Sequence, residues 1–310
     1  MPDPDHESGT QDWTMNPDVR LTLAGTQESS KRPVVLVTGA AGSLGKDMVQ
    51  ILLQSGAIVR AMDISEAGLA SLAYDVHINP YIEQNRALRV IYGDIRDPDR
   101  VTMAARGADY IIHAAAMKNL TVAGANPWET IRTNVEGTRN VGLAAIANKV
   151  NRAVFISSDK AVDPTTLYGT TKLLGEQLWL WFSRIQERTH FSIFRSGNFM
   201  PSAGSVFEVW QRQHEQKMPL TITDLNMYRY FIVLSEAAQI AVDMLYDSRN
   251  AEVFVPKMER IRVMDLMNQM YPNDDFRVTG PIPGEKLDEK LLNDYEKPSR
   301  ETERYWVVER

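Results

Sequence analysis

Short runs of apolar, mostly β-branched residues alternate with longer stretches of helical periodicity from residue 33 onward. The apolar runs predict seven strands, which cover residues 33–38, 57–62, 87–92, 109–115, 152–158, 191–196 and 252–256. Helices are expected between them, over Ser43 to Gln54, Pro127 to Asn148, Thr166 to Glu187 and Ser235 to Tyr246. The strand segments are almost continuously apolar, as in parallel strands that are covered on both faces. This order of elements predicts an α/β fold with a parallel sheet and crossover helices.

The pattern changes after about residue 197. Turn-rich segments such as NFMPSAGS and TITDLNMYRYF precede a late amphipathic helix and the tail VTGPIPGEKLDEKLL. We therefore expect a doubly wound parallel (Rossmann) sheet with a smaller, irregular C-terminal substrate lobe over its carboxyl edge, where such sheets bind ligands. The predicted domains are a polar N-terminal extension of residues 1–32, a dinucleotide-binding domain of residues 33–197 to which residues 230–256 return, and a substrate-binding lobe of residues 198–229 and 257–310.

The composition narrows the possible partners. The chain has 310 residues, of which 44% are hydrophobic and 24% charged, and its net charge of −6 disfavours a general affinity for nucleic acid. It has no cysteine, and its five histidines are scattered, so no metal site is expected. The first thirty residues lack the features of a signal peptide, and no run approaches the roughly 18 apolar residues of a membrane span. We expect a cytoplasmic protein without metal, nucleic acid or membrane span.

Three glycines stand between the first predicted strand and the first predicted helix, in VVLVTGAAGSLGKDMVQILL. Gly39 suits a tight turn, Gly42 a close approach of the backbone to a pyrophosphate, and Gly45 the packing of helix against strand. The helix amino terminus offers free N–H groups to phosphate. A bare glycine triplet is a weak signal, but here it opens the first βαβ unit. The turn predicts a dinucleotide site that also includes Ala41, Ser43 and Leu44.

Acidic residues follow the second and third predicted strands. Asp63 lies 18 residues after Gly45 and can accept hydrogen bonds from ribose hydroxyls, which favours NAD over NADP because a 2′-phosphate would be repelled. The plain alternative is a solvated aspartate at a strand end. Asp94 and Ile95, in YGDIRD, are expected beside the adenine, although Asp94 also suits a helix cap.

The segment SSDKAVDPTTLYGTTK, residues 157–172, gathers two lysines, an aspartate and a tyrosine. Tyr168 and Lys172 are four residues apart, so on a helix they lie on one face. A phenol has a pKa near 10, but a neighbouring ammonium group and a cationic nicotinamide would lower it and make the tyrosine an acid/base for a sugar or alcohol hydroxyl. The Tyr-x-x-x-Lys pattern alone is common; together with the glycine turn it points to a dehydrogenase site.

These motifs resemble the short-chain dehydrogenase/reductase superfamily, in its extended, sugar-nucleotide-modifying branch, over residues 33–295. The segments HAAAMKN, TNVEGTRNV, SSDKAVDPTTLYGTTKLLGE, GSVFEVW, PLTITD and PGEKLDEKLL are similar to the UDP-N-acetylglucosamine 4,6-dehydratases of bacterial polysaccharide and glycan biosynthesis. The resemblance implies a UDP-sugar substrate, NAD as cofactor with NADP possible, and a homodimer or higher homo-oligomer.

The resemblance also implies roles for four residues. Tyr168, supported by Lys172, removes the C4 hydroxyl proton while hydride leaves C4 for the nicotinamide. Lys160 removes the C5 proton that the new ketone makes acidic, and Asp159 protonates the departing C6 hydroxyl, after which hydride returns to C6. With a tyrosine at position 168, the sequence resembles the subgroup of the family that inverts the configuration at C5. The plain alternative for Asp159 and Lys160 is a solvated turn with an incidental salt bridge.

Further positions match the family's cofactor and substrate segments. Ala114 and Ala115 border the cofactor, and His113 is expected to be a strand residue rather than a base. Arg229 is assigned to the diphosphate because guanidinium suits bidentate phosphate contact. The substrate set is Lys118, Ser157, Ser158, Asn198, Ser205, Arg229, Glu285 and Lys286, and Asn134 lies close to it.

Three residues depart from the family pattern. Ala203 replaces an arginine, Ser196 replaces an aromatic residue, and Asp63 departs from the NADP-type pattern of inverting members. The rival activity is a UDP-sugar C4 epimerase on the same scaffold, which would oxidise C4 without eliminating water. A rival of another class is a non-catalytic NAD(P)-binding regulator, for which the Tyr168 and Lys172 pair has no use.

Overall fold

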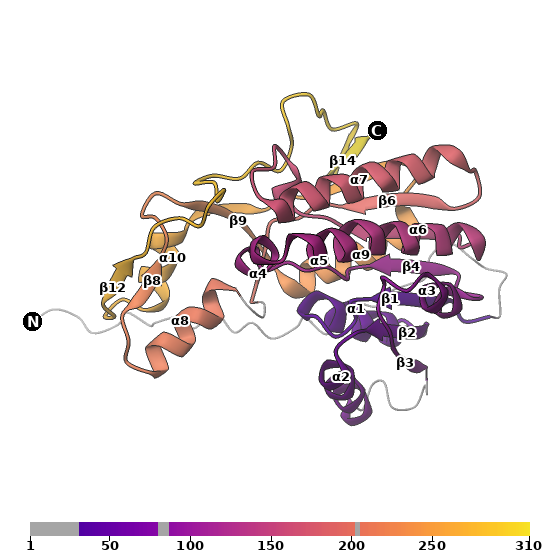
Figure 1. Cartoon of the computed structure of the whole chain (residues 1–310), viewed down its shortest axis with the longest axis horizontal. Helices are drawn as coiled ribbons and strands as arrows, with labels where there is room; N and C mark the ends of the chain where they lie inside the picture. The colour runs from indigo at the N-terminus through magenta and orange to yellow at the C-terminus, as the bar shows by residue number, and fades with distance from the viewer. Residues whose placement is uncertain (1–30, 80–86, 202–204) are drawn as a thin grey trace, which may run out of the picture. The chain divides into compact units, whose positions relative to one another are not determined.

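A large, mostly parallel sheet forms the centre of the computed structural model, which describes residues 31–79, 87–201 and 205–310 (Figure 1). Within these residues the sheet has nine strands in the order β13-β14-β10-β6-β5-β4-β1-β2-β3. Its parallel strands are β1 (Val34–Thr38), β2 (Ile58–Asp63), β3 (Leu88–Tyr92), β4 (Tyr110–His113), β5 (Arg152–Ile156), β6 (His190–Phe194) and β10 (Glu252–Pro256). All seven predicted strands are present, and the 3-2-1-4-5-6 order confirms the doubly wound fold.

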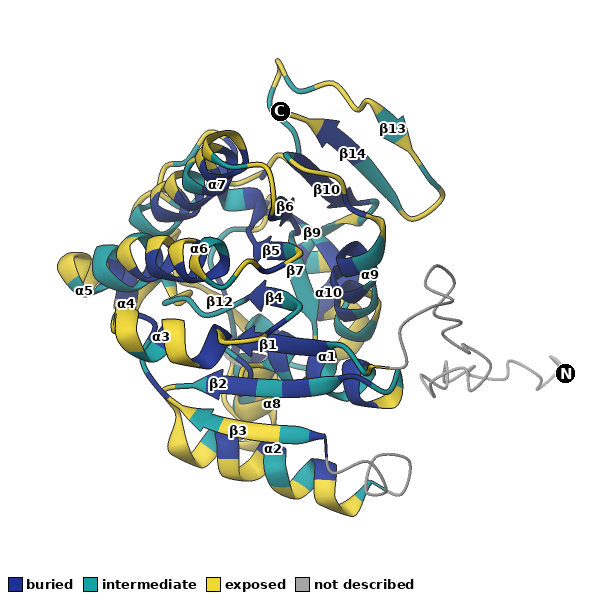
Figure 2. Cartoon of the chain, turned by 90° about the vertical axis from the view of Figure 1, so that its right-hand side faces the viewer, coloured by how far each residue is buried: buried dark blue, intermediate teal, exposed yellow. Residues whose placement is uncertain are grey.

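Helices cover both faces of this sheet (Figure 2). One face packs against α1 (Ser43–Gln54), α2 (Glu66–Ile78) and α9 (Leu234–Asp247), and the other against α3 (Pro98–Ala105), α6 (Thr138–Ala147) and α7 (Leu167–Ile185). Alternate residues of β1 serve the two layers: Val35 and Val37 contact the first, while Val34 and Leu36 contact the second. Side chains of a strand alternate between faces, so a strand buried on both sides must be apolar throughout.

The helix predicted over Pro127 to Asn148 is confirmed, but six residues in its middle are π-helical. It consists of α5 (Pro127–Ile131), a π-helical turn over Arg132–Gly137 and α6, and α4 (Leu120–Ala125) precedes it. Asn134 lies in the π turn, where its side chain accepts a hydrogen bond from the Met117 N–H (2.8 Å) and donates one to the Met117 carbonyl (3.0 Å). Such turns often mark functional sites, and this one holds the loop after β4 in place.

The two edges of the sheet differ from the expected pattern. β3 is an edge strand whose residues are largely exposed, so the expectation that every strand is covered on both faces is wrong there. At the other edge, β14 (Tyr305–Glu309) pairs antiparallel with β10, and β13 (Arg300–Glu301) pairs with β14. These two strands fall within residues 257–310, which the sequence assigns to the lobe, yet they belong to the large sheet.

Two small sheets and two helices fall largely within the residues that are predicted to form the lobe. The first sheet has the order β11 (Glu259–Arg262), β9 (Tyr228–Val233), β7 (Asn198–Met200), and the second pairs β12 (Phe276–Val278) with β8 (Leu220–Ile222). Phe207 and Trp210 of α8 (Val206–Glu215) pack with Phe231 and with Met267 of α10 (Val263–Met270) in a separate apolar cluster. Residues Lys31–Arg310 form one compact unit, so the division into dinucleotide-binding domain and lobe stays a prediction. The predicted N-terminal extension, up to residue 30, and Ala203 lie outside the described residues.

A buried ion network ties α7 to the C-terminal segment. Arg195, which is 1% exposed, donates from Nη2 to Glu176 (2.7 Å) and from Nη1 to Glu296 (2.8 Å). It also donates to the carbonyl of Leu291 (3.1 Å). The three charged groups fix the three segments that carry them, because an unpaired charge in the interior is costly.

Arg195→Met should therefore lower the free energy of unfolding by about 3–5 kcal/mol, since Glu176 would remain buried without its cation and Glu296 would keep only Arg310. Urea unfolding measures the change. Arg260→Met is the matched control, because Arg260 pairs with Asp288 at an exposed site (2.6 Å), where solvent screens the charges, and the change should cost much less stability. Similar losses for both variants would contradict the structural role of the network.

Candidate active site

A cavity of about 830 Å³ lies at the carboxyl ends of β1, β2, β4 and β5, between the sheet and the lobe. Parallel strands bring their carboxyl ends to one edge, so segments far apart in the sequence meet there. The predicted residues that line it are Gly39, Gly42, Ser43, Leu44, Gly45, Asp63, Asp94, Ile95, Ala114, Ala115, Lys118, Ser157, Ser158, Lys160, Tyr168, Lys172, Asn198, Ser205, Arg229 and Glu285. Ala41, Asp159 and Lys286, predicted for the same site, are not among the lining residues.

The glycine turn has the shape that the sequence predicts. Gly39 has a positive φ of +71°, and a Cβ there would lie 2.6 Å from the backbone nitrogen of Ala115. At Gly45 a Cβ would lie 2.1 Å from the Gly39 carbonyl oxygen, so only glycine lets α1 approach the turn. Gly42 is the N-cap of α1, whose first N–H groups have no acceptor within the helix. This cradle fits a pyrophosphate.

Two aspartates border the turn. Asp63 accepts hydrogen bonds from the Ala41 N–H (3.0 Å) and the Ser65 N–H (2.9 Å), which orients its carboxylate along the glycine turn. Ala41 therefore acts through its backbone on Asp63 and not as a wall of the cavity. Asp94 accepts from the backbone (2.9 Å) and side chain (2.6 Å) of Arg96; burial raises its pKa, but these bonds outweigh it and the pKa is lowered.

Tyr168 and Lys172 lie on the first turns of α7. Thr166 caps this helix by accepting from the Gly169 N–H (3.1 Å), and both side chains face the cavity. Nζ of Lys172 donates to the carbonyl of Ile156 (2.8 Å) and lies 6.0 Å from the centre of the Tyr168 ring. The i, i+4 spacing therefore brings the pair together as predicted.

The expected lowering of the Tyr168 pKa is not produced by the protein's own groups. Tyr168 lines the cavity and is half-buried, and burial raises its pKa; the hydrogen bond with Ser158 opposes this, and the charge of Asp159 adds to it. Burial also lowers the pKa of Lys172 to about 7, against the charge of Glu176. Desolvation is the larger effect in both cases because it penalises the charged form of each group.

Two other polar side chains at the edge of the site have structural partners. His113 is fully buried between Thr38 (2.7 Å) and Thr138 (3.0 Å), and burial, with the nearby charge of Lys172, lowers its pKa to about 3. It is a strand residue, as expected. Burial likewise lowers the pKa of Lys118, while Glu208 opposes the shift.

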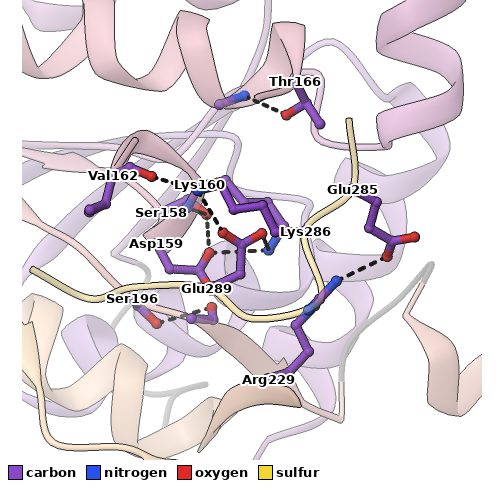
Figure 3. Close-up of polar contacts among 12 residues, drawn as sticks. Ser158, Asp159, Lys160, Val162, Thr166, Ser196, Arg229, Glu285, Lys286 and Glu289 are labelled. Atoms are coloured by element: carbon purple, nitrogen blue, oxygen red, sulfur yellow. Dashed lines mark hydrogen bonds and ion pairs between the residues drawn. The ribbon is translucent and has the colours of Figure 1, made fainter. Parts of the chain in front are cut away.

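The Asp-Lys pair forms a short helical turn after β5 (Figure 3). Nζ of Lys160 lies 3.1 Å from Oδ1 of Asp159, and the Ser158 hydroxyl donates to the same oxygen (2.9 Å). Asp159 is fully buried, and its Oδ2 has no hydrogen-bond partner among the described residues. Lys160 therefore reaches the cavity, whereas Asp159 lies behind Ser158 and Lys160. The predicted direct contact of Asp159 with the sugar does not fit this position.

Three predicted substrate residues, Arg229 on β9 and Glu285 and Lys286 in the C-terminal tail, differ in where their side chains point (Figure 3). Arg229 and Glu285 face the cavity as an ion pair (3.1 Å), and Nη1 of Arg229 also donates to the carbonyls of Tyr228 (2.8 Å) and Leu287 (3.2 Å). Lys286 points elsewhere: its Nζ donates to the Val162 carbonyl (2.8 Å) and lies 3.2 Å from Oε2 of Glu289.

Two carboxylates near the site were not found from the sequence. Glu176, four residues after Lys172 on α7, accepts a hydrogen bond from the Ser157 hydroxyl (2.6 Å). Oε1 of Glu289 lies 3.8 Å from Nζ of Lys160. The spacing of Glu176 from Lys172 was a usable signal, because both fall on one face of a helix. No local signal in the sequence marks Glu289, because only the folding of the tail brings it near Lys160.

The chain matches one protein family over nearly all of its described part: residues 35–310 fit the polysaccharide biosynthesis protein family. The chain belongs to this family. A UDP-N-acetylglucosamine 4,6-dehydratase (inverting) from Campylobacter jejuni is 33% identical over 278 residues, 88% of this chain and 82% of that protein. A UDP-glucose 4-epimerase from Rickettsia rickettsii is 32% identical over 269 residues, 84% and 78% of the two chains. The predicted resemblance to extended short-chain dehydrogenase/reductases of this branch is confirmed.

Solved structures share the fold. Pen from Bacillus thuringiensis superposes with a TM-score of 0.84 at 34% identity, covering 90% of this chain and 88% of that one. DesIV, a dTDP-glucose 4,6-dehydratase from Streptomyces venezuelae determined with NAD, has a TM-score of 0.72 at 21% identity, over 82% and 86% of the two chains. Among the described residues no helix is long and apolar enough to cross a membrane. In the same part of the chain, no group of three or more acidic or histidine side chains is arranged to hold a metal ion.

Gly45→Ala should destabilise the protein by about 1–3 kcal/mol, because its Cβ would press on the Gly39 carbonyl and force the turn away from α1. Gly42→Ala is the matched control: its Cβ would lie 3.3 Å from the same oxygen, so the loss should be smaller. Thermal unfolding without ligand measures both. A Gly45 variant as stable as the Gly42 variant would contradict the close packing described here.

Proposed function

We propose that this chain is an NAD-dependent UDP-N-acetylglucosamine 4,6-dehydratase of polysaccharide or glycan biosynthesis. The observation that carries the proposal is the convergence of Tyr168 and Lys160 on one cavity, with Asp159 3.1 Å behind the lysine. A tyrosine serves oxidation at C4, and an amine with a nearby carboxyl group serves elimination across C5 and C6. The 33% identity to the inverting Campylobacter jejuni enzyme supports this reaction and inversion at C5.

The residues present fit a dinucleotide. Gly39 and Gly45 let the turn and α1 pack closely, Gly42 leaves the amino terminus of α1 open to a pyrophosphate, and Asp63 is oriented to accept from ribose hydroxyls. NAD is favoured over NADP, because the Asp63 carboxylate would repel a 2′-phosphate. DesIV was determined with NAD, which supports the same cofactor here. Bound NAD supplies a hydride acceptor for C4 and a hydride donor for C6.

The first step requires Tyr168 to take the C4 hydroxyl proton. Its hydroxyl shares a hydrogen bond with Ser158, which holds it at the cavity wall, and the buried Lys172 ammonium lies on the same face of α7. Burial raises the pKa of Tyr168, so the phenolate forms only when positive charge is added beside it. The cationic nicotinamide ring would add that charge, which couples proton removal to cofactor binding.

The second step uses Lys160 and Asp159 as a pair. A proton that moves from the Lys160 ammonium to the Asp159 carboxylate, across 3.1 Å, leaves a neutral amine and a carboxylic acid. The amine can then take the C5 proton. Because Asp159 lies behind Ser158, it delivers its proton through that hydroxyl. The Ser158 hydroxyl donates to Asp159 (2.9 Å) while the aspartate is a carboxylate. Once Asp159 is protonated, this bond reverses, so that Asp159 donates to Ser158 as Ser158 donates to the departing C6 oxygen.

A UDP-sugar C4 epimerase is the second candidate, and the 32% identity to the Rickettsia rickettsii UDP-glucose 4-epimerase favours it. The Tyr168 and Lys172 pair serves either reaction. The two reactions diverge after C4 oxidation, because an epimerase needs neither an amine nor a proton donor near C5 and C6. The Lys160 and Asp159 pair therefore supports the dehydratase.

Proton NMR of UDP-N-acetylglucosamine incubated with the protein and NAD in heavy water should show a new C6 methyl signal and deuterium at C5. Lys160→Gln should slow the methyl formation by about 100-fold or more, because general base catalysis at C5 is lost. Lys290→Gln, at an exposed lysine paired with Asp294 (3.0 Å), is the matched control and should act like the native protein. A galacto epimer without any methyl signal would favour the epimerase.

Asp63→Ala should weaken NAD binding by about 1–3 kcal/mol, the worth of one or two hydrogen bonds to the ribose. The same change should improve NADP relative to NAD, because the repulsion of the 2′-phosphate disappears. Calorimetry with each cofactor gives the ratio of the NADP and NAD dissociation constants. A general loosening of the turn would leave this ratio unchanged. An unaltered NAD dissociation constant would reject the contact.

A further inference from the structure

Glu289 is a buried acid in the C-terminal tail that lies between two lysines (Figure 3). Its Oε1 is 3.8 Å from Nζ of Lys160, and its Oε2 is 3.2 Å from Nζ of Lys286. A buried carboxylate is stable only beside cationic or hydrogen-bonding partners. Lys286 belongs to the same tail, three residues before Glu289, whereas Lys160 belongs to the turn after β5. Through Lys160, Glu289 links the tail to that turn.

Lys160 needs such a link if its amine is to stay at one point of the cavity wall. A lysine side chain is a flexible four-carbon stem that ends in a point charge. Asp159 holds it at 3.1 Å from the same short turn, and Glu289 approaches at 3.8 Å from the tail. Two carboxylates on separate segments restrict the position of the ammonium more than one neighbour does.

The tail that carries Glu289 is itself attached to the segment after the Asp-Lys pair. Lys286 donates to the Val162 carbonyl (2.8 Å), and the Thr165 hydroxyl donates to the Gly284 carbonyl (2.6 Å). These bonds join residues about 120 positions apart, with sequence separations of 124 and 119. The position of Glu289 is therefore fixed relative to Lys160 by contacts that Glu289 does not make.

We propose that Glu289 is a positioning residue for the elimination step, which holds the Lys160 amine where the C5 proton of the sugar is removed. This inference rests on the proposed dehydratase activity. The oxidation at C4 uses Tyr168 and Lys172, whose Nζ donates to the Ile156 carbonyl, whereas the ion pairs of Glu289 go to Lys160 and Lys286. Loss of the Glu289 charge should therefore affect elimination and leave the first hydride transfer in place.

Glu289→Gln keeps the size of the side chain and removes its charge. The full chain with NAD is mixed rapidly with UDP-N-acetylglucosamine, and the absorbance of reduced nicotinamide and the C6 methyl product are followed in time. We expect reduced nicotinamide to form at close to the native rate and then to accumulate. Methyl formation should slow by about 10- to 100-fold, as for a displaced general base.

Asp288→Asn is the matched control. Asp288 is the neighbouring acid, but it is exposed and pairs with Arg260 (2.6 Å), so both steps should keep their native rates. Glu289→Asp retains the charge on a stem one methylene shorter, and it should restore part of the methyl formation that the Gln variant loses. If the Gln variant does not fold, the Asp variant carries the test through the same selective slowing of the second step.

Equal slowing of both steps would assign Glu289 a purely structural role and overturn the inference. Native rates for both steps in Glu289→Gln would overturn it as well. Either result leaves the dehydratase activity of the native protein standing. A native protein that forms no C6 methyl product at all would instead overturn the proposed function, and this inference with it.

Discussion

Charges that have been withdrawn from water at the carboxyl end of β5 must neutralise one another, and the site is built around this requirement. Asp159 is fully buried, and Lys160, Glu289 and Lys286 continue from it in alternating sign, with side chains that are 14%, 4% and 19% exposed. An isolated charge at such a depth would cost several kcal/mol. The cluster is stable because each group has an opposite neighbour, and this ties the tail to the turn.

A second cluster of paired charges lies deeper in the protein. Glu176 and Arg195 form a buried pair below Ser157, and Glu296 completes it from the tail. The C-terminal segment is thus joined to the sheet by two charge clusters, one beside the cavity and one under it. A tail held at two points can present Glu285 to the cavity, which explains how an irregular segment forms a defined wall.

Local patterns in the sequence were sufficient to predict the parallel strands of the large sheet and half of the site. Tyr168 and Lys172 are found from helical spacing, and Asp63 from its distance to the glycine turn. The return of β14 to the large sheet and the pairing of Glu289 with Lys160 could not be found in this way. They depend on where the tail folds, which no local period encodes. Asp159 was correctly placed next to Lys160, but its position behind Ser158 depends on packing.

The acid/base pair on α7 illustrates why the chemistry of this site is not a property of its side chains alone. Burial raises the pKa of Tyr168 and lowers that of Lys172 to about 7, so the protein's interior favours the neutral form of both. A neutral phenol beside a half-charged amine is a poor base. A positive charge brought next to the phenol would favour the phenolate but would oppose the Lys172 ammonium. The cofactor and Lys172 therefore act on Tyr168 in the same direction while competing with each other, and Glu176, whose charge favours the ammonium, moderates that competition.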